Sequence, residues 1–209
     1  METMLRAPAV PLVTVDPYFS VWSMADRLTD DFTRHWTGKR NAMTGLIRID
    51  GRPFRFAGKV EPNAENYYTE PQPMTQKRVQ VTPLSSIYEF EEAGVRLQVR
   101  FTTPLLLDDL DLLSRPASYV AFTVGSADGK PHRVQLYYDV SAEWCVDNSG
   151  QQVVWREDEA AGRHILQFSH HEQTVLNRSG DDHRIDWGQF YLAVGKSPAV
   201  RTYIGPADI

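Results

Sequence analysis

The sequence has a single cysteine, Cys145, among its 209 residues, and it has no long apolar run. One thiol excludes an intrachain disulfide and a zinc site built on several cysteines. The longest apolar run, Leu105-Leu106-Leu107, ends at Asp108, far short of the roughly 18 consecutive residues that a membrane helix needs. We therefore expect a soluble protein in which Cys145 is a small core residue beside Trp144.

Basic residues are not in excess either. The 22 lysines and arginines are outnumbered by 27 aspartates and glutamates, which gives a formal net charge of -5. This balance does not favour a polyanionic partner, so nucleic acid is set aside. Residues 1–6 lack a basic segment leading into an apolar stretch, so no secretory signal is visible. The compartment stays open between the cytoplasm and secretion after processing.

Common motifs of nucleophilic and phosphate chemistry are also missing from the sequence. Ser20, Ser23 and Ser114 lie outside any Gly-x-Ser-x-Gly context, and no glycine loop suited to a phosphate occurs. No internal repeat or heptad array is present. The missing motifs therefore give no support to nucleophilic hydrolysis. The missing repeats argue against solenoid and filament architectures.

The patterns that do occur are mainly those of β-strands. Residues 95–102 alternate apolar and polar side chains with period two, and residues 134–140 repeat the pattern. Asp50-Gly51 separates two strand-like runs, residues 45–49 and 53–56, and predicts a tight hairpin turn. Further strands are predicted by residues 86–91, 118–124, 153–156, 164–168, 173–176 and 190–194.

These short strands with frequent turns predict an all-β fold, a large antiparallel β-sandwich with long loops and little helix. One short helix is expected over residues 105–114, where Leu106, Leu110 and Leu113 could share a face. The proline-rich residues 61–77 predict an irregular connection. We expect it to separate a short N-terminal module, residues 1–60, from the main sandwich, residues 78–209.

A polar and aromatic stretch occupies residues 16–23 and 34–39. It includes Arg34, His35 and Trp36, and it is too polar for a core strand and too rich in rings for a solvated loop. We interpret it as a surface that meets a ligand or another domain. His35 could act as a proton shuttle, but no acid or nucleophile stands beside it, and the alternative is an edge histidine fixed by hydrogen bonds.

Residues 180–188 form a second candidate for binding. This segment lies between predicted strands, where binding groups are usually displayed. Its ordinary interpretation is a turn in which aspartates bond nearby amides and the arginine pairs with Asp186 or a neighbour. Its chemistry-bearing residues are Asp181, Asp182, His183, Arg184, Asp186 and Trp187.

Other clusters favour ordinary explanations. The acidic group at residues 108–111 does not match a calcium loop and is interpreted as a solvated turn or a capped short helix. His170 and His171 would face opposite sides of a strand and cannot chelate together, so surface histidines are expected. Glu143 beside Trp144 lacks a second carboxylate for glycosidase chemistry. No metal or other cofactor is predicted.

Five motifs in order resemble the glutaminase A family. The resemblance extends from about Leu5 to the end of the chain. One departure is Gln189-Phe190, where aromatic or aliphatic residues are more usual, and the other is the absence of the family's helical domain from this sequence. The motifs are Asp16-Pro-Tyr-Phe-Ser-Val-Trp-Ser23, Arg34-His-Trp-Thr-Gly-Lys39, Gly45-Leu-Ile-Arg48, Asp108-Asp-Leu-Asp-Leu-Leu-Ser-Arg-Pro116 and Asp181-Asp-His-Arg-Ile-Asp-Trp187.

The resemblance implies a place in a much longer protein. In that family the matching region is an N-terminal part of unknown function, followed by a helical domain similar to six-hairpin toroids. The implied parent activity converts L-glutamine and water to L-glutamate and ammonia. This chain would support or complete a site with that helical domain, and would be inactive alone. No catalytic residue can be carried across.

Two other hypotheses remain. One is a carbohydrate-binding or glycoside-hydrolase-associated module, in which Trp22, Trp36 and Trp187 form a platform for sugar rings. The other is a structural domain that mainly supports the helical partner. An arginine such as Arg34 would suit a substrate carboxylate, because its planar fork makes two parallel hydrogen bonds.

Overall fold

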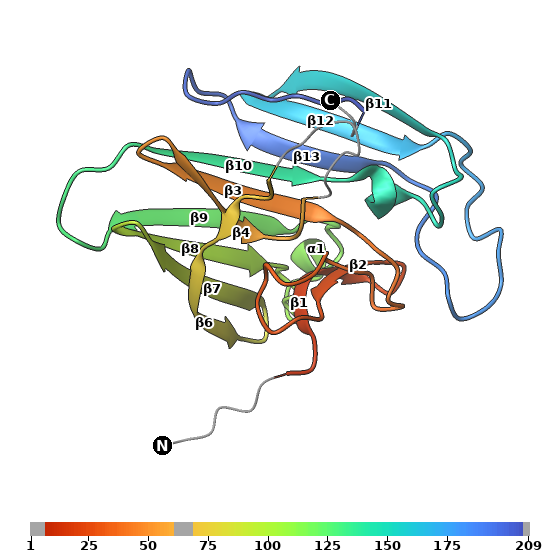
Figure 1. The fold of residues 1–209 in the computed structure, drawn as a ribbon. Coiled ribbons are helices and arrows are strands. Elements are labelled where there is room, and N and C mark those ends of the chain that lie inside the picture. Colours follow the sequence, from red (N-terminus) through yellow and green to blue (C-terminus); the bar gives the residue numbers. More distant parts are fainter. Residues whose placement is uncertain (1–6, 61–68, 207–209) are drawn as a thin grey trace. The chain divides into compact units, whose positions relative to one another are not determined.

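The computed structural model describes residues 7–60 and 69–206. The chain divides into two compact units, Met1–Asp139 (unit 1) and Val140–Ile209 (unit 2). Strands dominate the described residues of both, and helical structure is limited to short turns (Figure 1). Among these residues, no helix is long and apolar enough to cross a membrane.

Unit 1 contains three sheets within its described residues. Their strand orders are β1-β2, β10-β3-β4-β5 and β6-β7-β8-β9. The strands are β1 (Val10–Asp16), β2 (Phe19–Ser23), β3 (Met43–Ile49), β4 (Arg52–Ala57), β5 (Gln72–Pro73), β6 (Thr75–Val81), β7 (Ser85–Glu92), β8 (Val95–Thr102), β9 (Tyr119–Ser126) and β10 (Val134–Val140).

The predicted hairpin at Asp50-Gly51 is confirmed as the connection between β3 and β4, which pair antiparallel. Asp50 has a φ of 49° and Gly51 a φ of 87°. Positive φ at both central residues is the signature of a type I′ turn, whose twist matches that of the flanking strands. The dipeptide therefore fixes the register of this hairpin.

Strands β6 to β9 form an antiparallel meander in sequence order. The alternation predicted for residues 95–102 is confirmed, because β8 buries every second side chain from Val95 to Phe101. Its polar residues, such as Arg96 and Arg100, occupy the other face. This period-two pattern gives the sheet one face that can be buried.

Aromatic rings join the inner faces of the two four-stranded sheets of unit 1. Phe56 of β4 lies 5.8 Å from the ring of Phe122 of β9 and 6.2 Å from that of Phe90 of β7. Tyr138 of β10 also meets Phe122, at 5.8 Å. Since two sheets packed face to face through their inner side chains make a sandwich, the predicted all-β sandwich is confirmed.

Unit 2 has a three-stranded antiparallel sheet in the order β11-β12-β13. Its elements are the short 3₁₀ helix η1 (Ala142–Cys145) and the strands β11 (Val153–Ala160), β12 (Arg163–His170) and β13 (Phe190–Gly195). The ring of Phe190 stacks on Phe168 at 4.7 Å and meets the edge of Trp144 at 5.3 Å. These three side chains hold η1 against the sheet.

Two predicted elements differ from the structure. Residues 173–176 are not a strand: Leu176 has a φ of 50°, and Val175 and Leu176 are more than half exposed. The helix expected over residues 105–114 is limited to α1 (Leu110–Leu113), because Asp109 caps it by accepting a hydrogen bond from the Leu112 amide. The short capped helix expected for residues 108–111 is thus present.

The boundary between the two compact units differs from the boundary predicted from the sequence. The boundary between the compact units follows Asp139, within the range expected for the main sandwich. The irregular connection predicted for residues 61–77 lies partly outside the described residues, and its described end contains β5 and the start of β6. The division into residues 1–60 and 78–209 stays a prediction.

Candidate functional site

The predicted site residues fall in both compact units. Arg34, His35 and Trp36 belong to unit 1, and residues 181–187 belong to unit 2. Each group is built by contacts inside its own unit.

Arg34 uses its guanidinium on neighbours within the same loop. Nε donates to Asp31 Oδ2 at 2.8 Å and Nη2 to Asp31 Oδ1 at 3.1 Å, which is a bidentate ion pair. Nη1 donates to the Gly38 carbonyl oxygen at 3.0 Å. The hydrogen bonds between the two side chains lower the pKa of Asp31 and raise the pKa of Arg34. The fork predicted to receive a substrate carboxylate already holds the Asp31 carboxylate.

His35 is fully buried and fixed on both sides. Its Nε2 lies 3.2 Å from the Pro17 carbonyl oxygen, which can only accept, so Nε2 carries the proton. Nδ1 then accepts from Thr37, whose Oγ1 lies 3.0 Å away. This neutral tautomer corresponds to the histidine held by hydrogen bonds, the alternative to a proton shuttle.

Trp36 is half exposed, with 49% of its surface accessible. Its indole N–H donates to the same Pro17 carbonyl oxygen at 2.6 Å. Pro17 in turn lies in a turn where Asp16 Oδ1 accepts from the amides of Tyr18 and Phe19. The indole is therefore held in one orientation while part of its surface faces outward.

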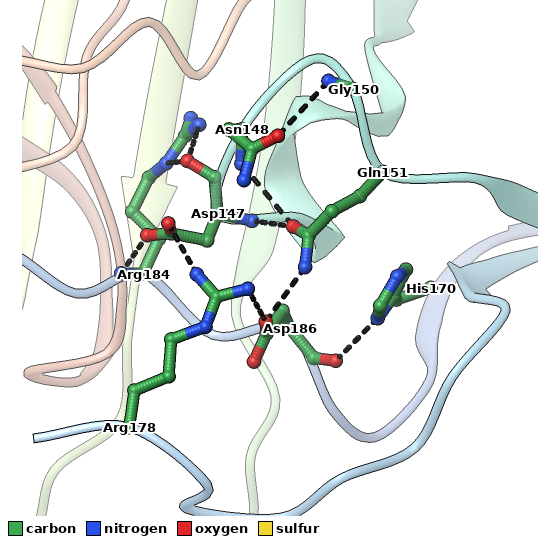
Figure 2. A network of polar contacts seen from close by, with 8 residues as sticks. All are labelled: Asp147, Asn148, Gly150, Gln151, His170, Arg178, Arg184 and Asp186. Carbon is green, nitrogen blue, oxygen red and sulfur yellow. Dashed lines mark hydrogen bonds and ion pairs between the residues drawn. The ribbon is translucent and has the colours of Figure 1, made fainter.

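The residues predicted in unit 2 divide by burial. Asp181 and Asp182 are exposed, His183 and Trp187 are half-buried, and Arg184 and Asp186 are buried, at 7% and 5% exposure. The structure brings Arg184 and Asp186 into one polar network, shown in Figure 2. Its other members are Asp147, Asn148, Gly150, Gln151, His170 and Arg178.

Arg184 binds Asp147 through both its side chain and its backbone. Its Nε and Nη2 donate to the Asp147 carbonyl oxygen, at 3.2 Å and 2.5 Å, and its backbone N–H donates to Asp147 Oδ1 at 3.2 Å. The ordinary interpretation of this segment had Arg184 pair with Asp186 or a neighbour, whereas these contacts go to Asp147, which lies 37 residues away in the sequence. Burial lowers the pKa of Arg184, and the charges of Asp147, Glu143 and Asp182 act in the opposite direction.

Arg178 bridges two buried carboxylates. Its Nη1 lies 2.6 Å from Asp147 Oδ2, and its Nη2 lies 3.0 Å from Asp186 Oδ2, as Figure 2 shows. The side chains of Asp147 and Asp186 are only 12% and 7% exposed, whereas that of Arg178 is 39% exposed. One cation that reaches in from an exposed loop thus neutralises two acids on buried segments.

Gln151 completes the network from the turn after η1. Its Oε1 accepts from the amides of Asp147, at 2.6 Å, and Asn148, at 3.2 Å. Its Nε2 donates to Asp186 Oδ2 at 2.8 Å. Because the oxygen must accept and the nitrogen must donate, the orientation of this amide is fixed by its partners.

His170 corrects the expectation of surface histidines. It is 6% exposed, and its Nδ1 lies 3.2 Å from the Asp186 carbonyl oxygen, so Nδ1 donates. Its neighbour His171 is exposed, as expected. His170 is the last residue of β12, whose final four residues are all buried.

Sequence reasoning missed Asp147, Gln151 and Arg178. None lies in a motif, and Arg178 stands 31 residues from its partner Asp147. An unpaired arginine in an otherwise polar loop gives no sign of which acids it will meet. Only the pairing of β12 with its neighbours brings these segments together.

Cys145 is the small core residue that was expected, at 4% exposure, and burial raises the pKa of its thiol to about 12. The adjacent Glu143 lies in η1, which Ser141 caps by accepting from the Glu143 amide. Within residues 7–60 and 69–206, no group of three or more His, Cys, Asp or Glu side chains is arranged to hold a metal ion.

Chemically, both clusters are built for fixed geometry. Arg34, Arg184 and Asp186 direct their charged atoms to partners in their own unit, and His35 is held as a neutral ring. The side chain with both a fixed orientation and a substantial exposed surface is Trp36. Each cluster can therefore present a defined surface of its own unit, supported by the polar groups of that unit.

Comparison with known proteins assigns the chain to a family. The model of the family described as "Domain of unknown function (DUF5127)" matches residues 84–208. The model of the family described as "Domain of unknown function (DUF4964)" matches residues 1–66. The chain belongs to the DUF5127 family. The DUF5127 match takes in β7 and every later strand, and so includes the whole network around Asp147.

This DUF5127 chain also has curated relatives. "Glutaminase A" of Aspergillus oryzae is 28% identical over 212 residues, which cover 96% of this chain and 29% of that protein. "Probable glutaminase" of Arthroderma benhamiae is 22% identical over 204 residues, covering 90% of this chain and 23% of that protein. The resemblance to the glutaminase A family is thus confirmed, and the chain spans under a third of these relatives.

Proposed function

We propose that this chain is the β-rich part of a longer glutaminase-like amidohydrolase, which converts L-glutamine and water to L-glutamate and ammonia. The observation that carries the proposal is the match of two proteins named as glutaminases along 96% and 90% of the chain. The chain spans 29% and 23% of those proteins. In the proposal, a helical domain of the same protein supplies the rest of the active site.

Within that enzyme, we assign the chain a supporting role. Arg34 already holds Asp31 with two hydrogen bonds, so a substrate carboxylate would have to displace an ion pair. Arg184 and Asp186 are buried among partners of their own unit. These facts favour docking of the helical domain over direct contact with glutamine. The proposed outer residues are Trp36 in unit 1 and, separately, Asp181 and Trp187 in unit 2.

The test uses the full-length protein and measures ammonia released from L-glutamine. A supporting role predicts that Arg34→Ala leaves KM for glutamine unchanged, with kcat expressed per folded enzyme. A rise in KM without loss of stability would place Arg34 in the substrate site. Full-length protein that is folded but releases no ammonia from glutamine would remove the amidohydrolase proposal itself.

Docking is tested separately by expressing the chain and the remainder of the protein as two pieces. We expect Trp36→Ala to weaken their association by tenfold or more, since tryptophans at interface centres often contribute about 2 kcal/mol. Tyr119→Ala is the matched control, because Tyr119 is an exposed ring on β9 with 60% of its surface accessible. Pieces that fail to associate at all would contradict the docking role.

A second candidate, a carbohydrate-binding module, is favoured by the exposed ring of Trp36. Its N–H is satisfied by Pro17, which leaves the ring surface available for stacking. Trp22 and Trp187 are less accessible than Trp36. Tryptophan fluorescence titrated with a glycan panel and with glutamine distinguishes the two functions, and a flat response to every glycan would exclude this one.

A further inference from the structure

His132 forms a cluster with two carboxylates that belongs to neither candidate site. It lies in the loop between β9 and β10, and its side chain is only 12% exposed. Nδ1 lies 2.7 Å from Asp50 Oδ2, in the turn between β3 and β4. Nε2 lies 3.0 Å from Asp128 Oδ1, in the same loop as His132.

This geometry determines the protonation state of the ring. An ionised carboxylate only accepts hydrogen bonds, so both ring nitrogens must donate for both contacts to form. A ring that donates from both nitrogens is an imidazolium. Both contacts can therefore form together only while the ring of His132 is the cation.

Three connections of unit 1 meet at this ring. The Asp50 amide donates to the Arg133 carbonyl oxygen at 3.0 Å, and the Arg133 amide donates to Asp50 Oδ1 at 2.8 Å. From the turn between β7 and β8, Gly94 accepts a hydrogen bond from the Ala127 amide at 2.7 Å. A Cβ on Gly94 would lie 2.8 Å from His132 Nε2, so this turn also presses against the imidazole.

The charged groups around the ring are few. The turn between β3 and β4 contributes Asp50, and the loop between β9 and β10 contributes Asp128, with Lys130 Nζ 4.0 Å from Asp128 Oδ2. The turn between β7 and β8 contributes the backbone of Gly94. Two acids thus face one cation, and the nearby lysine reduces their excess negative charge.

We propose that His132 is a protonation-controlled clamp, which as an imidazolium holds the turn between β3 and β4 to the loop between β9 and β10. When the ring loses one proton, one nitrogen presents a lone pair to a carboxylate and that contact is lost. The longer contact, from Nε2 to Asp128, is the one that opens. The turn that contains Gly94 then loses its packing against the ring.

The direction of the pH dependence follows from the partners. The bond to Asp50, and then the bond to Asp128, raise the pKa of His132 above its ordinary 6.5. A raised folded-state pKa gives stability that is fully present below pH 6.5 and is lost as the pH rises through the folded value. The bond to His132 also lowers the pKa of Asp128 from 3.8 to about 2, so the acid limit of the clamp lies well below neutrality.

The experiment follows His132 by NMR in the 209-residue chain, with hydrogen exchange measured at about pH 5.5 and about pH 9, on either side of an ordinary imidazole pKa. We expect His132 to titrate above 6.5 and to become the Nδ1–H tautomer at high pH. After correction for intrinsic exchange, protection of the Arg133 and Ala127 amides should fall by roughly two- to fivefold, which is typical of a partly exposed ion pair.

Two variants complete the test. His132→Gln should abolish the pH-dependent part of the change in protection, because its amide does not titrate in this range. His164→Gln is the matched control, since the ring of His164 meets a single carboxylate, Glu159, at 3.2 Å. The proposal is overturned if His132 titrates at or below 6.5, or if the pH-dependent change is the same in His132→Gln as in the wild type.

Discussion

Gly45 provides the sharpest test of how the two sheets of unit 1 pack. It lies in β3, opposite Ala57. A Cβ built there would lie 2.2 Å from Cε2 and 2.4 Å from Cζ of Phe56. Ordinary contacts between carbon atoms begin near 3.5 Å, so the added methyl would overlap the ring by more than about 1 Å. The backbone of Gly45 is not in the left-handed region, and the clash is therefore purely steric.

The ring of Phe56 has little room to yield. It is fully buried, and it meets the rings of Phe90 and Phe122 from the opposing sheet. We therefore expect Gly45→Ala to reduce the free energy of unfolding by about 3 kcal/mol, the upper end of the cost of overpacking a core. For a chain of this size, that corresponds to a fall in Tm of roughly 6–12 °C.

The assay is urea unfolding followed by circular dichroism, combined with a double-mutant cycle. Phe56→Leu removes the ring edge that the methyl would strike. The double variant should be more stable than the sum of the two single effects predicts, by about 1–3 kcal/mol. Strictly additive effects would refute the steric explanation. Gly125→Ala in β9 is the matched control, because a Cβ there meets no atom within 4 Å.

Three further predictions concern single side chains. Arg178→Gln should lower the free energy of unfolding by roughly 1–3 kcal/mol, because it leaves two buried carboxylates without their shared cation. Arg178→Lys keeps the charge and should lose less stability, and an equal loss in the two variants would contradict the bridging role. Cys145 should resist thiol reagents at pH 8 until urea unfolds the chain, because burial raises its pKa to about 12; rapid labelling of the native chain would contradict its burial. Asp109→Ala should lower the free energy of unfolding, measured in urea, by about 1 kcal/mol through loss of the α1 cap. Asp108→Ala is the control, and an Asp109→Ala variant as stable as the wild type would contradict the contribution of the cap.

Local chemistry made much of the fold predictable from the sequence. The turn at Asp50-Gly51 needs only its own two residues to adopt positive φ, and the alternation of β8 needs only a sheet with one buried face. The cap of α1 is similarly local, although the helix that follows is shorter than the leucine spacing suggested. In each case, the residues that encode the feature lie within a few positions of it.

The rest depended on partners that are distant in sequence. Residues 173–176 have the composition of a strand, but no described strand pairs with them and Gln173 instead donates to the His170 carbonyl oxygen. The sequence indicated Arg184 and Asp186 as candidates, yet it could not show that they meet Asp147, Gln151 and Arg178. Such pairings depend on strand order and loop path, which a single sequence does not reveal.

The fixed amide of Gln151 makes the network around Asp147 sensitive to chemical ageing. Deamidation would convert Gln151 to glutamate and place an oxygen where Nε2 now donates to Asp186, 2.8 Å away. Two carboxylates would then face each other at a buried position served by a single arginine. We expect Gln151→Glu, which reproduces this modification, to lower the free energy of unfolding measured in urea, and an unchanged stability would contradict the role of the amide.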